Sequence, residues 1–190
     1  KLKSNGHYVF VTAKSIPIVE QLLNAYNISF LNLGKKSDNI FRKGIDQIFY
    51  NKKIYKIVKR NNIELSIGTS ISIAQVSRIT KMKSLILDDD DDEVEPLFVK
   101  FGHRFSNTIL SPDCINRKTN KNIPYKGYHE LAYLHPSVFK PDPEVLQEVG
   151  LKKNEKFFIL RFVAFKGHHD LNAKGFDLNQ KKQLINLLLK

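Results

Sequence analysis

The chain has 190 residues, and 31 lysines and arginines against 19 aspartates and glutamates give it a formal net charge of +12. Its single cysteine, Cys114, excludes an internal disulfide framework and a zinc cluster of several thiolates. No apolar run reaches the ~20 residues of a membrane span and no signal peptide is visible, so we expect a reducing, cytoplasmic setting.

The positive charge has two interpretations. It permits binding to nucleic acid, to an anionic membrane surface or to a phosphorylated substrate. Lysine, asparagine and isoleucine are also abundant together, as AT-rich codons produce, and much of the charge is then ordinary solvated surface. Because no aromatic-basic motif of a known nucleic-acid module is present, we expect no nucleic-acid partner.

The first half of the chain alternates between strands and helices. Ser15 can cap a first helix that has Pro17 in its first turn and runs to about Tyr26. Strands are predicted over residues 8–13, 28–33, 64–67 and 84–87, and further helices over residues 41–61 and 71–80. This order predicts a Rossmann-like α/β fold, with a parallel sheet and helices on both faces.

The second half is less regular. After an acidic run over residues 88–92, the pattern predicts a helix over 94–105, a strand over 108–110, a polar loop over 116–122 and a short helix over 144–149. Proline-punctuated residues 123–143 are typical of a crossing between domains. We therefore expect a first domain over residues 1–140, and over residues 141–190 the crossing and the first β-α unit of a second Rossmann-like domain.

Residues 157–170 (FFILRFVAFKGHHD) are predicted to open that second domain. Their apolar start favours a strand buried on both faces, and a charge there needs a partner. Because ligands sit outside the carboxyl ends of such strands, the basic loop that follows is a candidate anion site ahead of a helix over 178–189. The candidate residues are Arg161, Lys166, His168, His169, Asp170 and Gly175. The alternative is an ordinary polar loop; a metal site is disfavoured because adjacent side chains diverge.

Three further groups follow predicted strands or the domain crossing. Asp88 and Asp89 open a run of five aspartates, which either hold a divalent cation or favour the start of a helix through its dipole. Thr69 and Ser70 follow a strand and would either line the same cleft, binding a polar group through backbone N–H, or form only a tight turn. His129 and Glu130 would act as a general base or belong to a structural hinge.

The predicted helix over residues 41–61 combines apolar and basic side chains. Ile45, Ile48 and Phe49 alternate with several lysines. Such a helix can lie on an anionic membrane, but more often it packs its apolar side on the sheet.

Several motifs together resemble one family. They are RFVAFKGHHD, YHELAYLHP followed by KPDPEVLQEVGL, and the acidic run leading into EPLFVKFGHRFSNTILSP. The chain resembles, over essentially its whole length, the prokaryotic glycosyltransferase-like proteins catalogued as domain of unknown function 354. That family is similar to the two-domain GT-B architecture of the lipid-linked N-acetylglucosaminyltransferase of peptidoglycan synthesis and of UDP-N-acetylglucosamine 2-epimerase.

The resemblance implies a division of labour. The first domain would bind a glycan or lipid-linked acceptor and the second a nucleotide-sugar donor, with the loop 166–170 facing the donor phosphates. No cofactor or metal is expected. The chain starts at Lys1 without a methionine and stops inside a predicted helix, so we expect a fragment that lacks its first strand and most of the donor domain, and is inactive alone.

Three functions follow as hypotheses. The favoured one is sugar transfer from a nucleotide sugar in surface polysaccharide synthesis, at the inner face of the membrane or in the cytoplasm. In it, Arg161, Lys166, His168 and His169 would neutralise the leaving diphosphate. The second is a nucleotide-sugar 2-epimerase, and the third a non-catalytic basic protein that binds nucleic acid or membranes.

Overall fold

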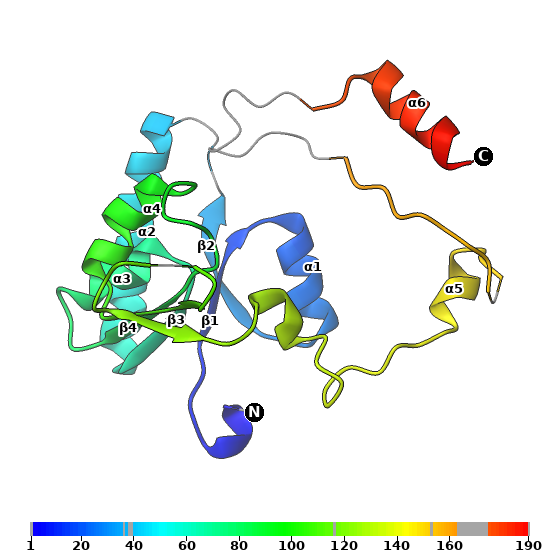
Figure 1. The fold of residues 1–190 in the computed structure, drawn as a ribbon. Coiled ribbons are helices and arrows are strands. Elements are labelled where there is room, and N and C mark those ends of the chain that lie inside the picture. Colours follow the sequence, from blue (N-terminus) through cyan, green and yellow to red (C-terminus); the bar gives the residue numbers. More distant parts are fainter. Residues whose placement is uncertain are drawn as a thin grey trace. The chain divides into compact units, whose positions relative to one another are not determined.

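The computed structural model describes residues 2–35, 37, 40–115, 117–152, 154–162 and 175–189, with the backbone alone at residues 40 and 41 (Figure 1). The chain divides into two compact units. The first unit comprises Lys1–Asp92 and Pro96–Lys126, and the second comprises Glu93–Glu95 and Gly127–Lys190.

The first unit opens with a parallel β-α-β motif. After a 3₁₀ turn, η1 (Lys3–Asn5), strand β1 (Val11–Ser15) pairs with β2 (Phe30–Lys35), and Val11 lies opposite Phe30. Helix α1 (Pro17–Ala25) connects them. Proline fits the first helical position because no intrahelical partner is available there for an N–H. The predicted capping of this helix by Ser15 is wrong, because the Ser15 hydroxyl donates to the Glu20 carboxylate at 2.7 Å instead of accepting from the helix backbone.

A second sheet has four parallel strands in the order β3-β4-β5-β6. The strands are β3 (Leu65–Gly68), β4 (Lys83–Leu87), β5 (Thr108–Pro112) and β6 (Asn122–Tyr125). The connecting helices are α2 (Ile40–Asn61), α3 (Ile71–Ser77), α4 (Pro96–Phe101) and the 3₁₀ turn η2 (His103–Phe105). Figure 1 shows α1 on one side of β1 and β2, and α2, α3 and α4 on the other. The predicted parallel α/β arrangement is confirmed.

The core lies between α2, α3 and the four-stranded sheet. Tyr50, Ile54 and Val58 recur every four residues along α2 and are buried, as are Ile86 and Ile109 of the sheet. The expected packing of the other apolar residues of α2 on the sheet is wrong, since Ile48 is 69% exposed and Phe49 59% exposed, and Ile45 is exposed too.

Polar contacts explain which side of α2 turns inward. The Gln47 amide donates to Ser72 at 2.8 Å and the Asn51 amide donates to Gln75 at 2.6 Å, both on α3. These bonds fix α3 against the Tyr50 side of the helix, so the side that carries Ile48 faces outward.

The second unit holds three helical segments among its described residues: η3 (His129–Ala132), α5 (Val145–Glu148) and α6 (Leu178–Leu188). The helix predicted over 178–189 is confirmed as α6. It begins with a capping box, in which the Asp177 carboxylate accepts from the Gln180 N–H and the Gln180 side chain accepts from the Asp177 N–H, both at 2.9 Å.

The strand expected to begin at Phe157 is not formed over residues 157–162, the part of it that the structure describes. These residues form no regular structure and are exposed, Ile159 by 85%. A strand needs a neighbour for its backbone N–H and C=O groups, and the described part of the second unit contains no strand to pair with it. A second Rossmann-like domain therefore stays a prediction.

No helix within the described ranges is both long and apolar enough to cross a membrane. The longest, α2, carries seven basic residues among its 22.

Candidate functional site

The candidate site lies at the carboxyl edge of the β3-β4-β5-β6 sheet. Because the strands are parallel, the loops that follow them meet at one edge, which is where open α/β sheets bind ligands. Thr69 and Ser70 follow β3. The acidic loop, residues 88–92, follows β4, and a loop that contains Arg117 follows β5.

Asp88 anchors the acidic loop. Its N–H donates to the Leu110 carbonyl at 3.0 Å, which extends the pairing of β4 with β5 by one residue. Its buried carboxylate accepts at Oδ2 from His103 Nε2 at 2.6 Å and lies 3.0 Å from Arg117 Nη1. The Asp90 N–H donates to its other oxygen at 3.3 Å. Both carboxylate oxygens therefore have partners inside the protein.

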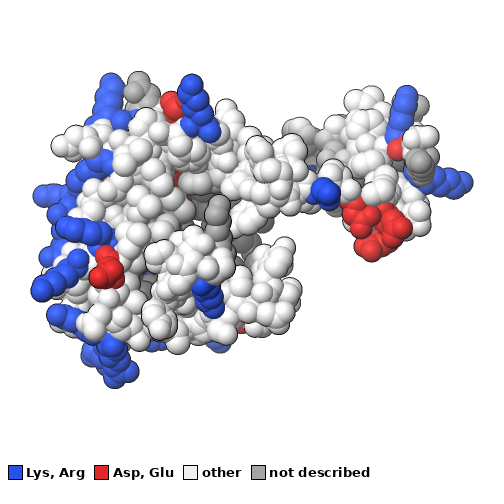
Figure 2. Space-filling model, turned by 90° about the horizontal axis from the view of Figure 1, so that it is seen from below, with Lys and Arg blue, Asp and Glu red and all other residues white. Residues whose placement is uncertain are grey.

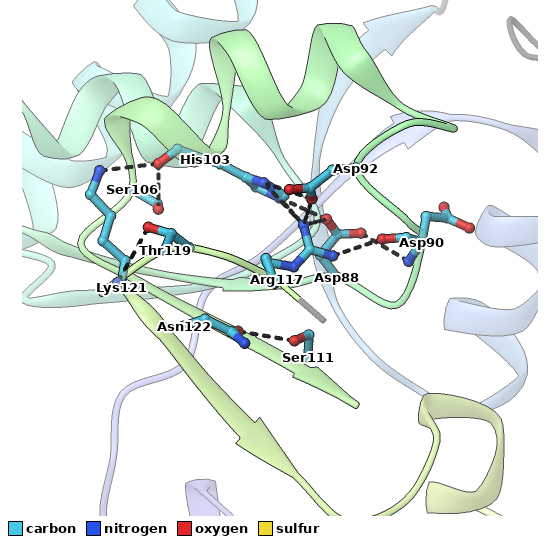
Figure 3. A network of polar contacts seen from close by, with 10 residues as sticks. All are labelled: Asp88, Asp90, Asp92, His103, Ser106, Ser111, Arg117, Thr119, Lys121 and Asn122. Carbon is cyan, nitrogen blue, oxygen red and sulfur yellow. Dashed lines mark hydrogen bonds and ion pairs between the residues drawn. The ribbon is translucent and has the colours of Figure 1, made fainter. Parts of the chain in front are cut away.

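Arg117 reaches the acidic loop from the segment that follows β5 (Figure 3). Its side chain is 1% exposed. Nη1 forms ion pairs with Asp88 and with Asp92, and Nη2 donates to the Asp90 carbonyl at 2.7 Å. A planar guanidinium suits this role, because its fixed donors can contact two carboxylates and a carbonyl together. The ion cluster consists of Asp88, Asp92, His103 and Arg117.

His103 completes the ion cluster. Its Nδ1 lies 3.1 Å from Arg117 Nη1, which can only donate. Nη1 also lies 3.3 Å from Nε2, so the guanidinium contacts both ring nitrogens while Nε2 donates to the Asp88 carboxylate at 2.6 Å. The ring packs edge-on against Phe98, with centroids 5.2 Å apart.

The turn that carries His103 is fixed by its backbone. Lys121 Nζ donates to the carbonyls of His103 and Arg104, at 3.2 and 2.7 Å. Gly102 is required before it, because a Cβ there would lie 2.7 Å from the Phe98 carbonyl oxygen. Burial and the nearby Arg78 charge lower the pKa of Lys121.

The surroundings keep Asp88 ionised. Burial by itself raises the pKa of its carboxyl group. The His103 hydrogen bond, the Arg117 charge and the Asp90 N–H together outweigh burial and hold the pKa below its ordinary value. The carboxylate is a fixed negative charge at neutral pH.

Asp88, Asp89 and Asp90 place oxygen atoms within 4.8 Å of one another, as a divalent cation would require. The arrangement does not fit such an ion well. The oxygens of Asp88 are already occupied, and the guanidinium of Arg117 adds a positive charge 3.0 Å from one of them.

The dipole explanation of the acidic run is wrong. Helix α4 begins only at Pro96 and has no acidic residue in its first turn. The macrodipole acts within about one turn of a helix end, so it does not account for Asp88. The acidic loop instead owes its position to Arg117 and His103.

The other predicted site residues have different placements. Thr69 is exposed and Ser70 half-buried at the carboxyl end of β3, and Asp89 is exposed beside Asp88. In η3 of the second unit, His129 is half-buried and Glu130 is exposed.

The predicted anion loop is only partly visible. Arg161 and Gly175 are exposed and lie outside helices and strands. Lys166, His168, His169 and Asp170 fall outside the described residues, so the anion site stays a prediction.

Sequence patterns did not indicate a functional role for His103 or Arg117. His103 fell inside a predicted helix and Arg117 inside a polar loop, and neither pattern marks a buried charge. One signal was present: Asp88 ends a buried apolar strand, and a carboxylate at such a point requires a cation. The loop after the neighbouring strand supplies it.

Comparison of the chain with protein-family models, with curated proteins and with solved structures finds no match.

Proposed function

We propose that the chain is the acceptor-side part of a GT-B-like sugar transferase that uses a nucleotide-sugar donor. The observation that carries the proposal is the acidic loop, which the ion cluster holds at the carboxyl edge of a parallel sheet. That edge is where such sheets bind ligands.

In this proposal the buried and exposed aspartates have different roles. Asp88 is a positioning residue, because its oxygens are occupied by His103, Arg117 and a backbone N–H. Asp89 is exposed beside it, and its carboxylate suits a hydroxyl group of a glycan acceptor. Thr69, exposed at the end of the neighbouring strand, offers a hydroxyl to the same ligand.

The resemblance supplies the rest of the proposed reaction. The donor diphosphate would be neutralised by the basic residues after position 160, and no metal would be needed. The position of Arg117 beside Asp88 supports this last point, because a cation bound at the acidic loop would face a guanidinium.

The first experiment measures thermal unfolding of the full-length protein with a panel of UDP-, GDP- and CMP-sugars. A donor present at 100 times its Kd stabilises the folded state by about 2.7 kcal/mol and raises the midpoint by several degrees. A panel in which no nucleotide sugar shifts the midpoint would contradict the proposal.

A product assay separates transfer from epimerisation. A transferase yields a new glycoside only when an acceptor is present, whereas a 2-epimerase converts the UDP-sugar alone.

Thr69→Ala and Asp89→Asn should raise the KM for the acceptor with the unfolding midpoint unchanged. Glu64→Gln is the matched control, because Glu64 is exposed just before β3, at the opposite edge of the sheet. Equal activity of all three variants would remove the acceptor site from this edge.

A further inference from the structure

One side of α2 is turned away from the core although much of it is apolar. Ile45, Ile48, Phe49 and Tyr55 are exposed, and they lie opposite the buried Tyr50 side of the same helix. Beside them, Ile79, which follows α3, is 67% exposed. An open groove of about 390 Å³ joins α2 to this segment, lined by Ile48, Asn51, Lys52, Tyr55 and Ile79.

The same side of α2 is strongly basic. Lys52, Lys56 and Lys59 point outward with the apolar residues, since all are exposed and spaced three or four residues apart. The whole helix carries seven basic residues and one acidic residue, Asp46. In Figure 2, Lys and Arg side chains crowd the border of the molecule on the side where α2 and α3 lie in Figure 1, with white side chains between them.

We propose that this outer side of α2, together with Ile79, docks on the surface of a lipid bilayer that contains anionic lipids. Exposed isoleucine and phenylalanine side chains enter the boundary between headgroups and acyl chains, and the lysines contact lipid phosphates. Because the helix is too polar to cross a membrane, it lies in the plane of the surface. This inference is independent of the proposed sugar transfer.

The charge pattern favours a bilayer over other occupants. A second copy of the chain would bring the same basic side against itself, and like charges oppose such a pair. Single-stranded nucleic acid is bound by stacking of successive bases on aromatic side chains in a basic groove. Phe49 and Tyr55 could stack in this way, but the exposed Ile45, Ile48 and Ile79 beside them form an aliphatic surface that suits acyl chains better than bases. An anionic bilayer complements both the lysines and the isoleucines.

The test is co-sedimentation of the 190-residue chain with vesicles of phosphatidylcholine alone, or of phosphatidylcholine and phosphatidylglycerol at about 3:1. We expect retention on the anionic vesicles that falls as salt rises, since surface charge acts within a Debye length. Lys52→Gln with Lys56→Gln should weaken retention about 25-fold, at about fivefold for each charge. Ile48→Asp with Phe49→Asp should weaken it at least about 100-fold, because two apolar side chains no longer insert.

Matched controls change equally exposed residues elsewhere. Ile18→Asp on α1 and Lys118→Glu in the loop after β5 should leave retention unchanged. Circular dichroism of every variant confirms that it is folded. Absence of retention on anionic vesicles, or retention that Ile48→Asp with Phe49→Asp leaves intact, would overturn the inference. So would a concentration-dependent dimer or a tight oligonucleotide complex that the same double variant abolishes.

Depth of insertion provides a second measurement. The chain contains no tryptophan, so Phe49→Trp introduces a single fluorescent reporter. Anionic vesicles should shift its emission to shorter wavelength, and brominated acyl chains should quench it. Ile18→Trp on α1 should show neither effect. Equal emission of both reporters on vesicles would also overturn the inference.

Discussion

Replacing Arg117 by methionine tests the ion cluster most severely. The variant keeps an unbranched, flexible side chain but removes the guanidinium that faces Asp88 and Asp92. Removing one partner of a buried ion pair costs about 3–5 kcal/mol, because the other charge is left buried without compensation. His103 still donates to Asp88 and Asp92 is partly exposed, so the lower end, about 3 kcal/mol, applies here.

The assay is thermal unfolding followed by far-ultraviolet circular dichroism at pH 7. For a chain of this length, about 3 kcal/mol corresponds to a fall of roughly 6–12 °C in the unfolding midpoint. Arg104→Met is the matched control, because Arg104 is exposed and directly follows His103 in the sequence, and it should stay within about 0.5 kcal/mol of the wild type. The double variant Arg117→Met with Asp88→Asn should lose less free energy of unfolding than the sum of the losses of the two single variants, because both substitutions remove the same contact.

A stabilising ion cluster is contradicted if Arg117→Met lowers the free energy of unfolding no more than Arg104→Met does. It is also refuted if the losses of the two single variants are strictly additive, since the side chains would then act independently.

Three further predictions concern the same region. The free energy of unfolding of the wild type should exceed that of Asp88→Asn most clearly above about pH 4. The pKa of Asp88 is lowered in the folded state, so the stabilisation by its carboxylate is complete above the unfolded pKa of about 3.9 and is lost as pH falls through the folded pKa. Equilibrium unfolding from pH 2 to 7 measures this, and a constant difference would contradict it. Gly102→Ala should cost about 1–3 kcal/mol because its Cβ would lie 2.7 Å from the Phe98 carbonyl oxygen, whereas Gly44→Ala, in open space on α2, should cost nothing; equal unfolding midpoints would contradict this. Isothermal titration with Mg²⁺ should show no saturable binding at the acidic loop below millimolar concentrations, and EDTA should not lower donor binding by the full-length protein; a micromolar Mg²⁺ site lost in Asp89→Asn would reverse that conclusion.

Local patterns in the sequence were sufficient to predict most elements of the first unit. The apolar runs ELSI and SLIL alternate with turn residues and with segments that have the periodicity of helices. The bounds of the strands that form there agree with the prediction to within one or two residues. The parallel order followed from the alternation of strands and helices, because parallel neighbours require crossover connections.

The predictions that failed share one physical cause: each depended on contacts between residues that are far apart in the sequence. The run FFILRF is as apolar as a buried strand, but apolarity does not provide a neighbouring strand for its backbone. On α2, periodicity alone could not decide which of two apolar sides faces the core, since the choice depends on the contacts of Gln47 and Asn51 with α3. The partners of Asp88 come from segments 15 and 29 residues further along the chain, beyond the reach of local patterns.

The location of the ligand site can be tested directly by hydrogen–deuterium exchange. The full-length protein is compared with and without the nucleotide sugar and acceptor that raise its unfolding midpoint. We predict slower exchange in peptides that cover residues 69–70 and 88–92, at the carboxyl edge of the sheet. Slower exchange around Glu64, at the opposite edge, with no change in the acidic loop would contradict the account.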